Sequence, residues 1–192
     1  MNTKKEQIVK NTAELIHSKG YESTKLSEII NASGIGKGQF YHYFTSKRDV
    51  GLHVVDFYVN MWRDELIYGI FNSEDSSMKK MENMLHWAIQ YHSCPSKISG
   101  CPFGNLALEM SEHDEEFRRK INELFHEWIH NLEVVISDLQ GEHKALQKAR
   151  AVVAQIEGGI LLMKNYQDAF ILRDMIEMIR SQYINEDREN GD

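Results

Sequence analysis

The residues best suited to chemistry lie between Gly34 and Lys47, in the stretch Gly-Ile-Gly-Lys-Gly-Gln-Phe-Tyr-His-Tyr-Phe-Thr-Ser-Lys. Its ammonium, amide, phenol and imidazole groups can donate hydrogen bonds to phosphate oxygens or to the edges of bases. Phe40 and Phe44 lie four residues apart, so they share one face of a short helix and leave the polar side chains on the other faces. The pattern predicts a recognition helix that enters the major groove of duplex DNA.

Two further helices are needed to hold this stretch in place. Apolar spacing predicts a helix over residues 4–19, which Gly20 would end with a left-handed backbone conformation. A second helix, with Thr24 as its N-cap, would stop near Gly34. Three short helices with a tight turn between the last two form a helix-turn-helix.

The charge of the chain is distributed unevenly. Its formal net charge is −7, from 22 Lys and Arg against 29 Asp and Glu. Residues 1–50 hold 8 basic against 5 acidic residues, a net charge of +3, so the remainder holds 14 against 24, a net charge of −10. Because a polyanion is attracted by the basic part, we expect contact with DNA at the N-terminus only.

The rest of the chain is predicted to be helical. Its prolines, Pro95 and Pro102, lie close together, and the long spans on either side favour helices, so we predict an all-α protein. No apolar run approaches the length of about eighteen residues that crosses a bilayer, and the first residues lead into no signal-type apolar segment. We therefore expect a cytoplasmic protein that makes no contact with a membrane.

Several N-terminal segments together match a known pattern: Lys19-Gly20-Tyr21, Ser23-Thr24, Ile29, Gly34 to Phe44, and Ser46-Lys47. Over roughly residues 5–50 they resemble the DNA-binding domain of the TetR/AcrR family of transcriptional regulators. The resemblance implies a helix-turn-helix domain over residues 1–50 and a helical effector-binding and dimerisation domain over residues 51–192. It also implies a homodimeric repressor that a small-molecule effector releases from double-stranded operator DNA.

The resemblance implies DNA contacts for a set of N-terminal residues: Thr24, Gly36, Lys37, Gly38, Gln39, Tyr41, His42 and Lys47. Most would contact the DNA backbone, Gly38 would permit a close approach, and Gln39 would read a base or, equally, touch only the backbone. Gly36 departs from the family, which usually has Ser or Thr there, so a hydroxyl contact with phosphate is lost. Taken singly, each polar residue also fits an ordinary solvated helix face.

A long helix is predicted to join the DNA-binding head to the body, because Ser46 and Asp49 have the spacing of a capping box. Its tilt would set the separation of two recognition helices in a dimer. The body carries large aromatic and methionine side chains that predict an effector cavity, with plain core packing as the alternative for each. They are Trp62, Trp87, Phe103, Met110, Trp128 and Met163.

The sequence around Cys101 predicts a second possible trigger for release from DNA. Proline favours the first position of a helix, so Pro102 would place Cys101 at the N-cap, where the helix dipole lowers the pKa of a thiol. Cys94 lies seven residues earlier and could resolve an oxidised Cys101 as a disulfide. In this alternative, oxidation or alkylation of Cys101 replaces the non-covalent ligand. The simpler explanation is a small buried residue that shapes a turn.

The last two helices are predicted to pair with a second copy, as the resemblance implies. An apolar repeat and a glycine pair, which would admit a close helix, give the predicted dimer interface: Ala149, Val153, Ile156, Gly159, Ile160, Ile176 and Ile179. His126 and His130 have a spacing that can hold a metal, but a solvated helix face explains them better. We expect no metal or cofactor, and no pair of side chains predicts an enzyme.

Overall fold

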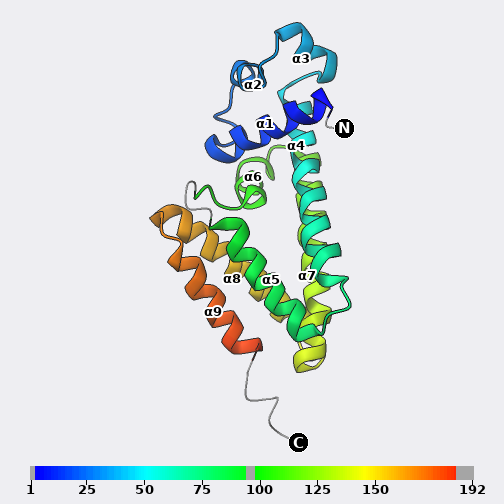
Figure 1. The fold of residues 1–192 in the computed structure, drawn as a ribbon, viewed down its shortest axis with the longest axis vertical. Helices are drawn as coiled ribbons and strands as arrows, with labels where there is room; N and C mark the ends of the chain where they lie inside the picture. The colour runs from blue at the N-terminus through cyan, green and yellow to red at the C-terminus, as the bar shows by residue number, and fades with distance from the viewer. Residues whose placement is uncertain (1–2, 94–97, 185–192) are drawn as a thin grey trace, which may run out of the picture. The chain divides into compact units, whose positions relative to one another are not determined.

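The structure, a computed structural model, describes residues 3–93 and 98–184, and its regular elements within these ranges are helices (Figure 1). This confirms the predicted all-α fold. The elements are α1 (Lys4–Lys19), α2 (Leu26–Ala32), α3 (Lys37–Tyr43), α4 (Lys47–Trp62), a π-helix (Arg63–Phe71), α5 (Ser77–His92), α6 (Pro102–Met110), α7 (Glu115–Gln140), α8 (Ala145–Tyr166) and α9 (Phe170–Tyr183). Among the described residues, none of these helices has the length and apolar character needed to cross a membrane.

The chain forms two compact units that differ from the division predicted at residue 50. Unit 1 takes in the described part of Met1–Met61 together with Pro102–Glu123, and unit 2 takes in the described part of Trp62–Cys101 and Leu124–Asp192. Residue 50 lies inside α4, which is one continuous helix. The unit that holds the predicted helix-turn-helix, called here the head, therefore includes α6 and the beginning of α7, which come from the middle of the sequence.

Local signals in the sequence determine where the helices of unit 1 begin and end and which face of α3 is buried. Gly20 ends α1 at the predicted position with a positive φ of 89°, but its ψ of 155° is not that of the left-handed helical conformation. Phe40 and Phe44 are 0% and 1% exposed, so the apolar face of α3 is fully buried. At the start of α4 the backbone N–H of Asp49 donates to Ser46 Oγ at 3.0 Å, while the Asp49 carboxylate accepts from the Thr45 backbone N–H at 2.7 Å. The predicted capping box is thus present with its return bond one residue earlier.

Within unit 1, α6 and α7 contact the turn between α1 and α2 closely. Glu109 of α6 accepts a hydrogen bond from the backbone N–H of Glu22 at 2.8 Å, in the turn between α1 and α2. A Cβ added to Gly20 would lie 2.8 Å from the Glu109 carboxylate, so glycine permits this approach. Phe117 of α7 packs edge-on against Tyr21, with ring centroids 5.3 Å apart.

Gly51 on α4 makes this packing possible, and we expect Gly51→Ala to destabilise the chain. A Cβ there would lie 2.6 Å from the Tyr21 ring and 2.9 Å from the Phe117 ring. Overpacking of this kind costs about 1–3 kcal/mol, which exceeds the gain in helix propensity of about 1 kcal/mol. Urea denaturation of the full chain would measure the loss.

Gly38→Ala is the matched control for Gly51→Ala, because a Cβ at Gly38 meets no atom within 4 Å. We expect this variant to unfold at the same urea concentration as the parent chain or at a higher one. Equal stability of Gly51→Ala and Gly38→Ala would contradict the packing of Tyr21 and Phe117 around α4.

In unit 2, α8 and α9 lie side by side and bury their apolar seams against the protomer's own core (Figure 1). A Cβ on Gly159 would lie 3.2 Å from Met175 and 3.3 Å from Leu172, so the close helix at this glycine is α9 of the same chain. All of the residues predicted to face a partner are buried inside the protomer: Ala149, Val153, Ile156, Gly159, Ile160, Ile176 and Ile179. A surface open to a second copy must therefore be formed by other residues.

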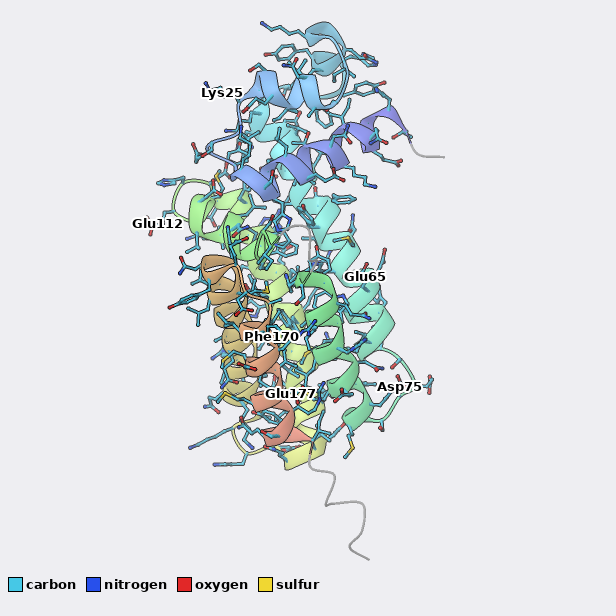
Figure 2. The ribbon with its side chains drawn as sticks, turned by 60° about the vertical axis from the view of Figure 1, so that its left-hand side comes forward. Lys25, Glu65, Asp75, Glu112, Phe170 and Glu177 are labelled. Atoms are coloured by element: carbon cyan, nitrogen blue, oxygen red, sulfur yellow. The ribbon has the colours of Figure 1, made fainter. Side chains whose placement is uncertain are left out.

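The same two helices also carry exposed apolar side chains. On α8 they present Leu161 and Leu162, which are 56% and 46% exposed, and the side of Gly158, where an added Cβ would meet no atom within 4 Å. Around the beginning of α9 they present Tyr166 and Phe170, which are 67% and 68% exposed; Phe170 is labelled in Figure 2.

Candidate nucleic-acid interface and aromatic interior

Most of the residues predicted to contact DNA lie on the exposed face of α3. Gly36, Lys37, Gly38, Gln39, Tyr41 and His42 are all exposed, and Tyr41 is 48% exposed. Phe40 and Phe44 hold the helix from the opposite side, so its donors face outward as the spacing predicted. The arrangement exposes ammonium, amide, phenol and imidazole donors along one short helix, and donors of these kinds can contact the edges of bases in a DNA groove.

The glycines of this segment leave its backbone uncovered by side chains. Gly36 is the N-cap of α3, with extended backbone angles φ −83° and ψ 159°, and the Phe40 N–H donates to its carbonyl at 3.0 Å. A Cβ at Gly36 or Gly38 would meet no atom of the protein within 4 Å. Glycine is therefore not required by packing at either position, and its effect is to let another molecule approach the backbone closely.

Lys47 is held in position at the start of α4. Its ammonium lies 4.3 Å from the centre of the Tyr21 ring and donates to the Glu22 carbonyl at 3.4 Å. Burial raises the pKa of the Tyr21 phenol to about 12, so the ring beneath the ammonium is neutral. A cation placed over an aromatic face loses little mobility when it meets a phosphate.

Thr24 does not present its hydroxyl to a ligand, contrary to expectation. The side chain is 1% exposed, and its hydroxyl donates to the Gly20 carbonyl at 2.6 Å, which stabilises the turn after α1. The N-cap of α2 is Lys25, whose backbone N–H donates to the Glu28 carboxylate at 2.8 Å. Lys25 is exposed and labelled in Figure 2, so it replaces Thr24 as the candidate for a phosphate contact.

The interior of unit 2 gathers all three tryptophans of the chain. Trp62 contacts Trp87 and Trp128 edge-on, with centroids 4.9 Å and 5.7 Å apart. Tyr91, which sequence reasoning missed, joins them 5.5 Å from Trp62 and 5.4 Å from Trp87. Its position four residues after Trp87 on one helix face was the available signal. We call Trp62, Trp87, Tyr91 and Trp128 the aromatic cluster.

The other residues predicted for an effector cavity are divided between the two units. Phe103 and Met110 are buried in unit 1, where Phe103 packs against Tyr58 with centroids 6.1 Å apart. Met163 is buried in α8 of unit 2. The prediction therefore joined residues from two separate units, because spacing along the chain does not show which helices pack together.

Cys101 and a glutamate form a polar contact that the sequence did not predict. Cys101 is 3% exposed and precedes α6, and Glu157 lies inside α8. Burial raises the pKa of Glu157 from 4.5 to about 7, although the bond from Cys101 lowers it. Cys94 lies outside the described residues. A signal for Glu157 existed: it is an acidic residue inside an otherwise apolar helix seam.

An exposed helix-turn-helix on a helical body defines a DNA-binding regulator, and comparison with known proteins agrees. Residues 8–54 match the sequence profile of the bacterial regulatory proteins of the tetR family. Residues 77–178 match the profile described as transcriptional regulator LmrA/YxaF-like, C-terminal domain. The chain belongs to the TetR family of transcriptional regulators, as its resemblance implied, and it is not an enzyme.

Individual relatives support the assignment along nearly the whole chain. An uncharacterized HTH-type regulator from Lactococcus lactis subsp. lactis is 35% identical over 181 residues, covering 93% of this chain and 92% of that protein. The regulator LmrA of Bacillus subtilis (strain 168) is 29% identical over 160 residues, covering 82% and 85%.

Solved structures share the fold. A TetR regulator from Legionella pneumophila gives a TM-score of 0.84 at 22% identity, covering 95% of this chain and 98% of that one. The reduced form of E. coli NemR gives 0.81 at 21% identity, covering 93% and 95%.

Proposed function

We propose that this chain is a homodimeric repressor whose α3 helix enters the major groove of an operator and which a small-molecule effector releases. The structure of α3 is the main support for DNA binding in this proposal. Two buried phenylalanines hold the helix, and its exposed face consists of hydrogen-bond donors and glycines. A regulator of this kind works in the cytoplasm, where it meets chromosomal DNA.

The residues proposed to contact DNA are Lys25, Gly36, Lys37, Gly38, Gln39, Tyr41, His42 and Lys47. The lysines and His42 supply contacts with the phosphates, and the Tyr41 phenol donates to a phosphate oxygen. Gln39, exposed on α3, pairs with the edge of an adenine. Gly38 lets the α3 backbone approach the groove.

The test of DNA binding is the double variant Lys37→Ala with Tyr41→Ala. With an operator selected from a random duplex library by the parent chain, we expect affinity to fall about 100-fold and the slope of log affinity against log salt to decrease by about one. Fluorescence anisotropy over a range of salt concentrations measures both.

Tyr68→Ala with Lys79→Ala is the matched control, because it removes the same two groups from exposed positions in unit 2. We expect it to bind the operator like the parent. If the control lost as much affinity as the α3 variant, the recognition surface would have to lie elsewhere.

The contacts of α6 and α7 with the α1–α2 turn and with α4 give a route from an effector to α3. Glu109 of α6 holds the turn before α2. Arg48 of α4 donates to the carboxylate of Asp114 at 2.5 and 3.0 Å and to that of Glu116 at 3.0 Å, where α7 begins. These bonds hold the pKa of the Asp114 carboxyl below its usual value. A shift of α6 or α7 therefore moves the head and changes the separation of paired recognition helices.

We propose that the dimer forms through the apolar outer face of α8 and α9, called here the outer face and made of Gly158, Leu161, Leu162, Tyr166, Phe170 and Met178. These side chains are exposed in the protomer, apart from the partly exposed Gly158. Monomeric proteins rarely expose so many large apolar side chains together. A second copy that covers the outer face would remove them from water.

The alternative trigger, modification of Cys101, has less support. Reactive cysteines occupy accessible, electropositive positions, whereas Cys101 is 3% exposed and lies against a carboxylate. We therefore favour a non-covalent effector. A Cys101→Ser variant should still release operator DNA in response to the inducer, and loss of that response would restore the thiol trigger.

A further inference from the structure

A groove lies between α1 and α4, and all of its lining residues belong to unit 1. Its volume is about 580 Å³, which is within the range of small-molecule sites. The surface that it exposes is mostly apolar, and charged side chains complete the lining. We call it the α1–α4 groove, and its lining residues are Lys5, Glu6, Val9, Lys10, His53, Asp56, Phe57 and Asn60.

The ammonium of Lys5 is held in a fixed position at this groove. It lies 2.9 Å from Nε2 of His53, and because an ammonium can only donate, Nε2 accepts and carries no proton. His53 is therefore neutral, and its Nδ1–H donates to the Asp49 carbonyl at 2.9 Å. An ammonium has three N–H donors, so two of those on Lys5 have no acceptor among the residues that the structure describes.

The charges at the groove favour an anion. Asp56 pairs with Lys120 of α7 at 2.5 Å, and Glu6 accepts from a backbone N–H at 2.7 Å in the N-terminal cap of α1. Neither Lys5 nor Lys10 forms an ion pair with a carboxylate of the described part of the chain. With Lys120 included, the groove holds three ammonium groups against two carboxylates, an excess of one positive charge.

From this arrangement we propose that the α1–α4 groove binds a small organic anion: a carboxylate on a flat apolar body. The carboxylate accepts hydrogen bonds from the two N–H donors of Lys5 that the protein leaves unused, and the nearby ammonium of Lys10 adds to the attraction. The apolar body packs on Val9 and on the partly exposed ring of Phe57. This inference goes beyond the effector-controlled release proposed above, because it places a second ligand in the unit that holds α3.

A ligand in the groove would act on the residue that ends α3. Phe44 is the C-cap of α3 and is 1% exposed. The His53 ring packs edge-on against the Phe44 ring with centroids 5.3 Å apart, and the Lys5 ammonium lies 5.4 Å from the centre of the same ring. A bound carboxylate would compete with His53 for the ammonium and cancel a positive charge beside α3. We therefore expect the ligand to weaken operator binding, and the operator to weaken binding of the ligand by the same factor.

Three phenyl compounds of matched shape test the proposal by isothermal titration calorimetry on the full chain: anionic cinnamate, neutral cinnamamide and cationic cinnamylamine. We expect cinnamate to bind at least about tenfold more tightly than cinnamamide, and cinnamylamine to bind most weakly. In Lys5→Gln, cinnamate should lose at least about tenfold in affinity while cinnamamide is unchanged. The control Lys79→Gln removes an exposed ammonium from unit 2 and should behave like the parent.

Two further variants separate the charge from the fold and from the apolar contact. Lys5→Arg keeps the positive charge and should retain the preference for cinnamate. Phe57→Ala removes the apolar partner from a partly exposed position and should weaken cinnamate and cinnamamide alike. The proposal is overturned if cinnamamide or cinnamylamine binds as tightly as cinnamate, if Lys5→Gln keeps the preference, or if none of the three binds at millimolar concentration.

Fluorescence anisotropy with the operator tests the connection to α3. Saturating cinnamate should lower the operator affinity of the parent at least about fivefold relative to the same concentration of acetate, and it should have no such effect on Lys5→Gln. An unchanged operator affinity of the parent would show that the groove does not act on α3. A parent that binds cinnamate with the expected preference but binds no operator would support the ligand site and refute the proposed regulator.

Discussion

A chain carrying Leu161→Glu and Phe170→Glu is expected to sediment as a monomer and to lose operator binding. Both side chains are more than half exposed in the protomer, at 56% and 68%, so the changes leave its core intact. In a dimer they would bury two carboxylates per protomer without partners, which costs several kcal/mol. We expect the dissociation constant of the dimer to rise at least about 100-fold, or by about 2.7 kcal/mol.

Operator binding should fall with the dimer, because two linked heads bind two half-sites with a much higher effective concentration than one head. Analytical ultracentrifugation and anisotropy on the same samples measure both effects. Tyr68→Glu with Val134→Glu places the same charges on exposed side chains outside the outer face, at 60% and 52% exposure, and should remain dimeric. A dimeric Leu161→Glu, Phe170→Glu chain would show that copies associate through another surface.

Glu157→Gln is expected to stabilise the chain at pH 8 but not at pH 4.5. Burial raises the pKa of the Glu157 carboxyl from 4.5 to about 7, so between these values the folded chain holds the proton more tightly than the unfolded chain. The free energy of unfolding therefore falls as the pH rises from 4.5 to 7 and is constant in this respect above 7. The full shift corresponds to at most about 3 kcal/mol.

Glutamine has no charge to bury, so the difference in unfolding free energy between Glu157→Gln and the parent should grow across that interval. Urea denaturation at a fixed protein concentration, repeated from pH 4.5 to 8, gives this difference directly. Glu142→Gln should follow the parent, since residue 142 is exposed. Parallel curves for Glu157→Gln and the parent would mean that the carboxylate is already compensated in the folded chain.

The elements of the DNA-binding head were predictable because their signals are local. A glycine after an apolar repeat ends α1, Ser46 and Asp49 begin α4, and the Phe40–Phe44 pair shows which face of α3 is buried. Each signal lies within a few residues of the structure it determines. The role of Thr24 was predicted wrongly, although its signal is equally local. A threonine near the start of a helix can hydrogen-bond to later or to earlier residues, and here its hydroxyl donates to the Gly20 carbonyl.

The partners of each helix were not predictable, because packing between distant segments leaves little trace in periodicity. The seam of α8 repeats as a partner-facing helix would, yet α9 of the same chain covers it at Gly159. The tryptophans were correctly singled out as large buried groups, but Phe103 and Met110 belong to a different unit. Glu157 was missed because its burial is a matter of packing in the folded chain, and Cys101, which affects its pKa, lies more than fifty residues away in the sequence.

The hydrogen bond from the Glu22 backbone N–H to the Glu109 carboxylate has a consequence for anyone exchanging operator specificities between regulators. A graft of the first sixty or so residues onto a foreign body would leave the turn after Gly20 facing whatever that body supplies at the position of Glu109. A larger or uncharged side chain there would displace the turn, and α2 and α3 with it. A DNA-binding unit that is to be moved to another body must therefore include residues 102–123 as well as the N-terminal segment.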